Sequence, residues 1–306
     1  MNRVRELTGV SCAYKQGIFG DGIGVAVLDS GVNERHPDLR GRLVYSYNYL
    51  TASAEGGDDC GHGTHICGII GGTGEASGGR YQGLAPRCHF LSLKVLDREG
   101  NGSSASLARA LYWLIEHGRE YDVRIVNISA GSAEIQGRKK SGLLKAVEEA
   151  WDAGFLICAA AGNQGPAPSS ITVPGTSPKV ITVGSSDDNR AVRFPGGKRT
   201  DYSGRGPTAA CVCKPDVAAP GAYIRSCNAD FEKPGRSFYT EKSGTSMATP
   251  VVSGSLALLL SKERALTNKE VKLRLRSSCL DLGLPRNRQG WGQIWVPGLL
   301  GLQAGS

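Results

Sequence analysis

The chain has 306 residues, of which 40% are hydrophobic and 21% are charged. These proportions are typical of a soluble globular protein, so they exclude a disordered chain and allow a sizeable core. The formal net charge of +8 is spread thinly, and the densest basic clusters, 138–140 and 286–288, are not interleaved with the aromatic residues that stack bases, which argues against a nucleic-acid partner.

The cysteines and the first residues of the chain indicate the cellular compartment in which we expect the protein to act. The nine cysteines show no regular spacing, and an odd number leaves at least one thiol free, as in a reducing environment. The first twenty residues carry Arg3, Arg5, Glu6 and Lys15 but no apolar stretch or cleavage site of a secretory signal. No run of eighteen apolar residues occurs. We therefore expect a cytoplasmic protein with no membrane partner.

Along the chain, short apolar runs bounded by glycine alternate with helical patterns. The predicted strands are 23–28, 90–96, 123–128, 155–160 and 180–183. The predicted helices are 103–116, 143–153, 246–261 and 268–278. The helix 246–261 is apolar nearly all round, so we expect it to be buried. Thr267 is the expected N-cap of the helix 268–278. Alternation of this kind predicts a three-layer α/β fold, with a mainly parallel central sheet and helices on both faces. Because no linker or repeat interrupts it, we expect one domain at 21–306 after an N-terminal extension at 1–20.

Polar residues stand where predicted strands end or helices begin, which is where open α/β sheets gather their chemistry. A serine nucleophile needs a hydroxyl, a base and a carboxylate that orients the base. Ser246 begins the apolar helix, His62 lies between glycines, and Asp29 ends the first strand, so these three are the predicted catalytic residues. Asn163 follows the strand 155–160, and its amide is the predicted oxyanion donor together with the backbone N–H of Ser246.

Four segments carry a family resemblance. Residues 27–32, 61–65, 161–163 and 244–250 resemble the signature segments of the subtilisin-like serine peptidases, in that family's chain order of Asp, His and Ser. The stretches that look most like the AprX-like intracellular subtilases of Gram-positive bacteria are 150–154, 162–168, 203–208 and 214–221. The resemblance covers about residues 20–282. It implies a serine endopeptidase that cleaves polypeptides through an acyl-enzyme, in protein degradation or processing, and requires no cofactor.

The same resemblance implies a substrate-binding site. Two extended segments would clamp the substrate by strand addition: Gly100, Asn101 and Gly102 on one side, and Ser129, Ala130 and Gly131 on the other. The walls of the primary specificity pocket would be Ala160, Ala161, Gly162 and Gly175. Such small walls indicate a roomy pocket for large apolar or aromatic side chains.

Two metal hypotheses arise, and neither yields a predicted metal ligand. Asp38 matches a position that binds calcium in secreted subtilisins, but the loop 73–83 lacks their Asn-rich pattern, and a surface turn explains Asp38 equally well. The pattern of Cys60, His62, His65 and Cys67 resembles a compressed zinc site, yet zinc ligand pairs usually lie further apart. We instead expect His65 to be a packed, hydrogen-bonded residue. We also expect Cys60 or Cys67 to lie near His62 and confer sensitivity to thiol reagents.

Two other functions stay open. The chain could be a non-catalytic protein-binding module that retains the fold, because fold does not determine function. It could also be a processing peptidase dedicated to one protein. The sequence defines neither the natural substrate nor the oligomeric state.

Overall fold

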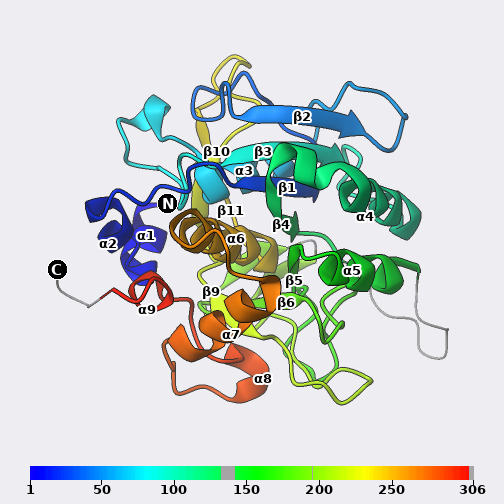
Figure 1. Ribbon diagram of the computed structural model, residues 1–306, viewed down its shortest axis with the longest axis vertical. Helices are drawn as coiled ribbons and strands as arrows, with labels where there is room; N and C mark the ends of the chain where they lie inside the picture. Colours follow the sequence, from blue (N-terminus) through cyan, green and yellow to red (C-terminus); the bar gives the residue numbers. More distant parts are fainter. Residues whose placement is uncertain (132–141, 195, 303–306) are drawn as a thin grey trace.

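The computed structural model describes residues 1–131, 142–194 and 196–302, so the basic cluster at 138–140 lies outside the described residues. A parallel sheet of seven strands crosses the middle of the protein in the order β2-β3-β1-β4-β5-β6-β9 (Figure 1). Its strands are β1 (Gly24–Asp29), β2 (Leu43–Asn48), β3 (His89–Lys94), β4 (Val123–Ile128), β5 (Leu156–Ala160), β6 (Ile181–Ser185) and β9 (Val217–Ala219). The five predicted strands and the parallel sheet are confirmed.

Strands in the middle of this sheet are buried on both faces. Every residue of β1, β5 and β6 is buried, which explains why their sequences are nearly continuous apolar runs rather than alternating ones. Within the sheet, β1 pairs with β3 on one side and β4 on the other. This register brings the carboxyl ends of β1, β4 and β5 to the same edge.

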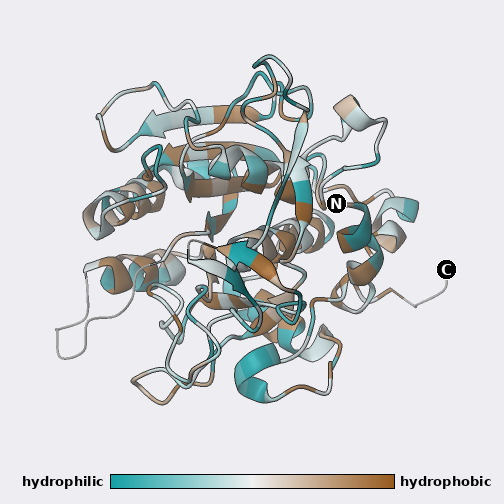
Figure 2. Cartoon of the chain, turned by 180° about the vertical axis from the view of Figure 1, so that it is seen from behind, coloured by the Kyte–Doolittle hydropathy of each residue, from teal (hydrophilic) through white to brown (hydrophobic). Residues whose placement is uncertain are grey.

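Helices cover both faces of the sheet, as predicted (Figure 1). Helices α3 (His62–Gly71) and α6 (Thr245–Lys262) pack against each other on one side, and α4 (Ser104–His117) and α5 (Gly142–Asp152) pack against each other on the other side. From Met247 to Leu260 every residue of α6 is buried, so this helix forms part of the core around its whole circumference. Figure 2 shows hydrophobic residues concentrated along the sheet and α6.

Smaller elements complete the fold. Two antiparallel hairpins follow β6, formed by β7 (Val192–Phe194) with β8 (Gly197–Arg199), and by β10 (Ile224–Cys227) with β11 (Tyr239–Lys242). The remaining helical elements are α1 (Asn2–Thr8), α2 (Ser11–Lys15), the short 3-10 helices η1 (Glu75–Ser77) and η2 (Gly118–Tyr121), α7 (Asn268–Ser278), α8 (Arg286–Gln289) and α9 (Val296–Leu299). The predicted cap of α7 is confirmed, because Thr267 and Glu270 form a reciprocal capping box.

Residues 1–20 pack against the rest of the chain. Val4, Val10 and Ala13 are buried in the main core, and Arg3 forms an ion pair with Asp187 at 2.7 Å. The division of the chain at residue 20 stays a prediction. Among the described residues, none of the helices combines the length and the apolar character needed to cross a bilayer.

Candidate active site

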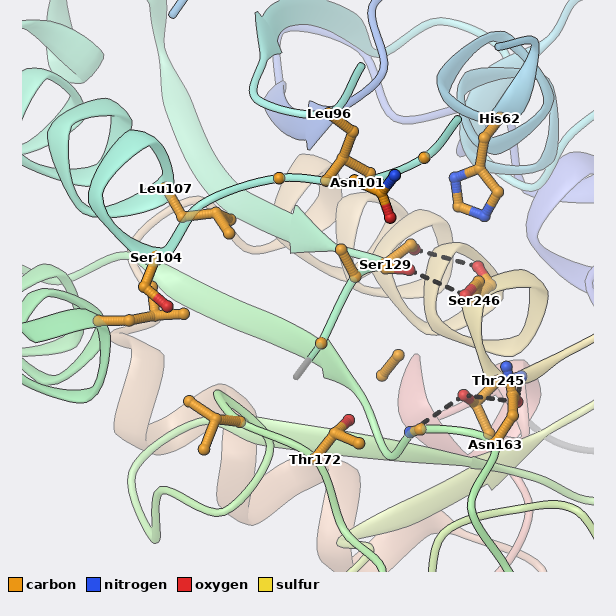
Figure 3. Close-up of a pocket in the computed structure, with 18 of the residues that line it drawn as sticks. His62, Leu96, Asn101, Ser104, Leu107, Ser129, Asn163, Thr172, Thr245 and Ser246 are labelled. Atoms are coloured by element: carbon orange, nitrogen blue, oxygen red, sulfur yellow. Dashed lines mark hydrogen bonds between the residues drawn. The ribbon is translucent and has the colours of Figure 1, made fainter. Parts of the chain in front are cut away.

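The carboxyl edge of the sheet brings the predicted catalytic residues into one region. Asp29 is the last residue of β1, His62 is the first residue of α3, and Ser246 lies in the first turn of α6. Asn163 lies three residues beyond the end of β5. Figure 3 shows His62, Ser246 and Asn163 around one pocket. These residues are far apart in the chain, and the parallel topology explains why they meet.

Asp29 and His62 form a buried contact. The Nδ1–H of His62 donates a hydrogen bond of 2.8 Å to Oδ1 of Asp29, which also accepts the backbone N–H of Ser30 at 2.8 Å. The Asp29 side chain is only 1% exposed, whereas that of His62 is 22% exposed. Since the carboxylate can only accept, it fixes the proton on Nδ1 and leaves Nε2 as the basic nitrogen.

A network around Asp58 fixes the position of His62. The carboxylate of Asp58 accepts hydrogen bonds from the hydroxyl of Ser30 at 2.8 Å and from the N–H and hydroxyl of Thr64 at 2.8 and 2.6 Å. Gly63 approaches the turn that follows β1 so closely that a Cβ there would lie 2.1 Å from the carbonyl oxygen of Gly31. The first turn of α3 is therefore held directly against the end of β1.

Ser246 belongs to a second network, which sequence reasoning missed (Figure 3). Its hydroxyl donates to the carbonyl oxygen of Ser129 at 2.8 Å, and the hydroxyl of Ser129 donates back to the carbonyl oxygen of Ser246 at 3.0 Å. Asn127 donates to the Ser129 hydroxyl and accepts from Ser253 on α6, each at 2.9 Å. This chain of hydrogen bonds ties the first turn of α6 to β4.

Asn163 is oriented by Thr245. The backbone N–H and the hydroxyl of Thr245 both donate to Oδ1 of Asn163, at 3.0 and 3.2 Å, and the Thr245 hydroxyl accepts the N–H of Gly162 at 3.1 Å. The carbonyl side of the Asn163 amide is therefore occupied, and its NH₂ group remains available. The preceding residue, Gly244, has φ of 140°, a conformation that glycine adopts far more easily than other residues.

A cleft of about 510 Å³ runs past His62, Asn163 and Ser246. Its lining includes most of the predicted substrate-binding residues: Gly100, Asn101, Gly102, Ser129, Ala130, Gly131, Ala160 and Gly162. The segments 100–102 and 129–131 are separate stretches of its lining (Figure 3). The cleft also has an apolar part that the sequence did not predict, formed by Leu96, Leu107, Leu143 and Val173.

Ala161 and Gly175, also predicted for this wall, do not line the cleft. Ala161 is fully buried, with its N–H bonded to Val183 and its carbonyl oxygen bonded to Thr172. A Cβ on Gly175 would lie 3.0 Å from the carbonyl oxygen of Ala160.

The cysteines and histidines near His62 have different environments. Cys60 lines the cleft, whereas Cys67 is buried and all nine cysteines are free. His65 is buried and its Nε2–H donates to the carbonyl oxygen of Ile224 at 3.0 Å, as expected of a packed histidine. Burial keeps the pKa of His65 well below its usual value. Among the described residues, the metal-compatible cluster that forms is His36, Asp38 and Cys227, and it contains none of the four residues of the compressed zinc pattern.

The surroundings of Asp38 do not fit calcium. One carboxylate oxygen accepts the N–H of Ala76 at 3.0 Å, and the other accepts the hydroxyl of Tyr239 at 2.9 Å. Its other close neighbours are an imidazole and a thiol, while calcium requires six to eight oxygen ligands. We derive no role for calcium at this position.

Comparisons with known proteins agree with this geometry. Residues 20–292 match the subtilase family, peptidase S8. The chain is 38% identical over 275 residues to serine protease AprX of Bacillus subtilis (strain 168), covering 86% of this chain and 62% of that protein. It is 33% identical to subtilisin BL of Lederbergia lenta, covering 89% of this chain and 88% of that protein. Among solved structures, sphericase superposes with a TM-score of 0.77 at 29% identity, covering 94% of this chain and 97% of the other. The chain thus spans less than two thirds of the length of AprX.

Proposed function

The chain belongs to the subtilase family, and on this premise we propose that it is a serine endopeptidase whose catalytic triad is Asp29, His62 and Ser246. The observation that carries the proposal is the 2.8 Å hydrogen bond between His62 and the buried Asp29, in a cleft that also holds Ser246. This bond leaves Nε2 of His62 as a base directed away from Asp29, as general-base catalysis requires.

The reaction begins with a rotation of the Ser246 side chain. In the structure its hydroxyl donates to Ser129, so it must exchange this partner for Nε2 of His62 when substrate binds. His62 then accepts the hydroxyl proton as Ser246 attacks the peptide carbonyl, and later delivers that proton to the leaving amine. Asp29 keeps the imidazole in the required tautomer and stabilises its positive charge. Water releases the acyl group in the second half of the reaction.

The oxyanion receives two N–H donors. The amide NH₂ of Asn163 is available because Thr245 occupies its carbonyl oxygen. The backbone N–H of Ser246 belongs to the first turn of α6, where N–H groups have no acceptor within the helix. Donors fixed in place before the reaction stabilise the charge that develops on the carbonyl oxygen.

The cleft fits an extended polypeptide. We propose that segments 100–102 and 129–131 pair with the substrate backbone by strand addition. The small residues Ala160 and Gly162 leave room for a large side chain next to the cleaved bond. Leu96, Leu107 and Leu143 form an apolar surface in the same cleft and favour a second apolar side chain in the substrate.

We propose that catalysis requires no cofactor and that the enzyme acts in the cytoplasm, in protein degradation or processing. The nucleophile, base and oxyanion donors all come from the chain itself. Nine free thiols are what a reducing compartment maintains.

Turnover of a peptide amide by the wild type and by Ser246→Ala tests the triad. We expect the variant to lose about 10⁶-fold in kcat, the loss found in subtilisin, a relative of this chain. Ser261→Ala, near the other end of the same helix, should keep full activity and controls for the substitution itself. Full activity of Ser246→Ala would refute the proposal.

Catalytic activity would also exclude the binding-module alternative. Cleavage of casein would indicate a broad endopeptidase, whereas cleavage of a single endogenous protein would indicate a dedicated processing peptidase.

A further inference from the structure

Three side chains with metal-binding chemistry converge away from the cleft residues. His36 and Asp38 lie in the chain between β1 and β2, and Cys227 is the last residue of β10. Their exposed fractions are 0%, 0% and 1%. One ligand atom from each lies within 4.8 Å of the other two. An imidazole, a carboxylate and a thiol thus come together in the protein interior.

Each of these groups is also held by a further hydrogen bond. The Nε2–H of His36 donates to the carbonyl oxygen of Phe238 at 2.8 Å, which leaves Nδ1 as an acceptor; in the structure Nδ1 accepts the backbone N–H of Asp38 at 3.2 Å, and a bound ion would take the place of this hydrogen bond. The hydroxyl of Tyr239 donates to Asp38 at 2.9 Å, and the thiol of Cys227 lies 3.8 Å from the same oxygen. A histidine that binds a metal almost always donates its other N–H to a carbonyl or carboxylate group, which orients the ring.

The Asp38 carboxylate is held by neutral hydrogen-bond donors, which are the N–H of Ala76, the hydroxyl of Tyr239 and the thiol of Cys227. Within the described part of the chain, Asp38 forms no ion pair with a lysine or arginine, although its side chain is fully buried. A buried carboxylate normally has a cationic partner or a metal ion. A divalent cation would neutralise the carboxylate together with a thiolate at Cys227.

Aromatic rings pack against the His36 side of the cluster. The rings of Phe231, Phe238 and Tyr239 lie 5.0, 6.0 and 5.9 Å from that of His36, centre to centre. An apolar shell of this kind limits access of water and strengthens electrostatic attraction to an ion. Cys227 also packs on α3, since a Cβ on Gly68 would lie 2.6 Å from its sulfur.

We propose that His36, Asp38 and Cys227 bind a divalent metal ion of the zinc type. Zinc accepts nitrogen, oxygen and sulfur ligands, unlike calcium, and prefers four ligands in tetrahedral geometry. A water molecule supplies the fourth ligand. The ion joins the segment after β1 to the β10–β11 hairpin, beside the helix that carries His62, and its role is structural. Figure 1 shows this hairpin alongside α3.

Cobalt(II) serves as the probe, because thiolate ligation gives it a charge-transfer absorption in the near ultraviolet. The protein for the test is Ser246→Ala, which prevents self-digestion, with Cys211→Ser and Cys213→Ser added because both thiols are exposed and would bind metal on their own. We expect one cobalt ion per chain with a thiolate band, displaced by an equal amount of zinc. Absence of stoichiometric binding would overturn the proposal.

Cys227→Ser should abolish the band, whereas Cys60→Ser, which removes the thiol that lines the cleft, should retain it. A band that survives in folded Cys227→Ser, or that depends on Cys60, would overturn the assignment. Tyr239→Phe keeps all three ligands and should weaken cobalt binding about 10- to 100-fold, the effect typical of outer-shell partners. If Cys227→Ser does not fold, His36→Gln provides the same comparison. Zinc should raise the unfolding temperature of the parent protein and leave that of Cys227→Ser unchanged.

Discussion

Replacing Asn163 by leucine should slow turnover without weakening substrate binding. Thr245 directs two donors, its N–H at 3.0 Å and its hydroxyl at 3.2 Å, to Oδ1 of Asn163, so the amide can offer only its NH₂ group to the cleft. Leucine has a similar volume and no donor. We expect kcat to fall about 10²- to 10³-fold, or about 3 to 4 kcal/mol, the magnitude established for the oxyanion amide of subtilisin, a relative of this chain.

The assay is steady-state hydrolysis of a peptide amide, with kcat and KM determined separately. An interaction formed mainly in the transition state lowers kcat and kcat/KM together and leaves KM nearly constant. Asn163→Asp provides a second comparison. Its carboxylate can keep the Thr245 hydrogen bonds through one oxygen but places the other, negatively charged, beside the oxyanion, so it should lose more activity than leucine.

Asn189→Leu is the matched control, since this side chain is an exposed amide that does not line the cleft and forms no hydrogen bond among the described residues. We expect its kcat to stay within about threefold of the wild type, as is usual for surface changes of less than about 0.5 kcal/mol. An Asn163→Leu enzyme that keeps most of its kcat, or that loses efficiency only through KM, would refute the oxyanion assignment.

Other consequences can be tested in parallel. Thr245→Val should lower kcat about fivefold, because one hydrogen bond that orients Asn163 is worth about 1 kcal/mol, while Thr245→Ser should restore it; equal activities of Thr245→Val and the wild type in a kinetic assay would contradict this role. A mercurial reagent should inhibit the wild type but not Cys60→Ser, since Cys60 lines the cleft, and equal inhibition of both would place the sensitive thiol elsewhere. Burial lowers the pKa of Lys272 to about 8 in the folded protein, from 10.5. Between these values the unfolded chain binds more protons, so the free energy of unfolding should rise with pH by up to about 1.4 kcal/mol per unit. Urea titrations should show a smaller rise in Lys272→Met, and an unchanged rise would rule out Lys272 as its source.

Strands buried on both faces were predictable from sequence, and others were not. β1, β5 and β6 are continuous apolar runs because the sheet covers them completely. β2 is half-exposed at the sheet edge and β9 has three residues, so neither produces a clear apolar run. The N-terminal helix α1 was missed because its burial depends on packing against distant parts of the chain.

At the site, sequence motifs led to the prediction of Asp29, His62, Asn163 and Ser246, but not of the residues that form hydrogen bonds with them. Ser129 was predicted only as a substrate-binding residue, yet it contacts Ser246 across 117 positions of the chain. Asn127 and Ser253 meet across 126 positions. Such contacts depend on how β4 packs against α6, which no local pattern encodes. The cluster around Asp38 was missed for the same reason, since Cys227 lies 189 residues away.

Intact-mass spectrometry after incubation with a fluorophosphonate shows whether Ser246 is a nucleophile, because only an activated serine reacts rapidly. We expect one adduct per wild-type chain, located on Ser246, and none on Ser246→Ala. Absence of an adduct on folded wild-type protein, or an adduct that persists in Ser246→Ala, would contradict it.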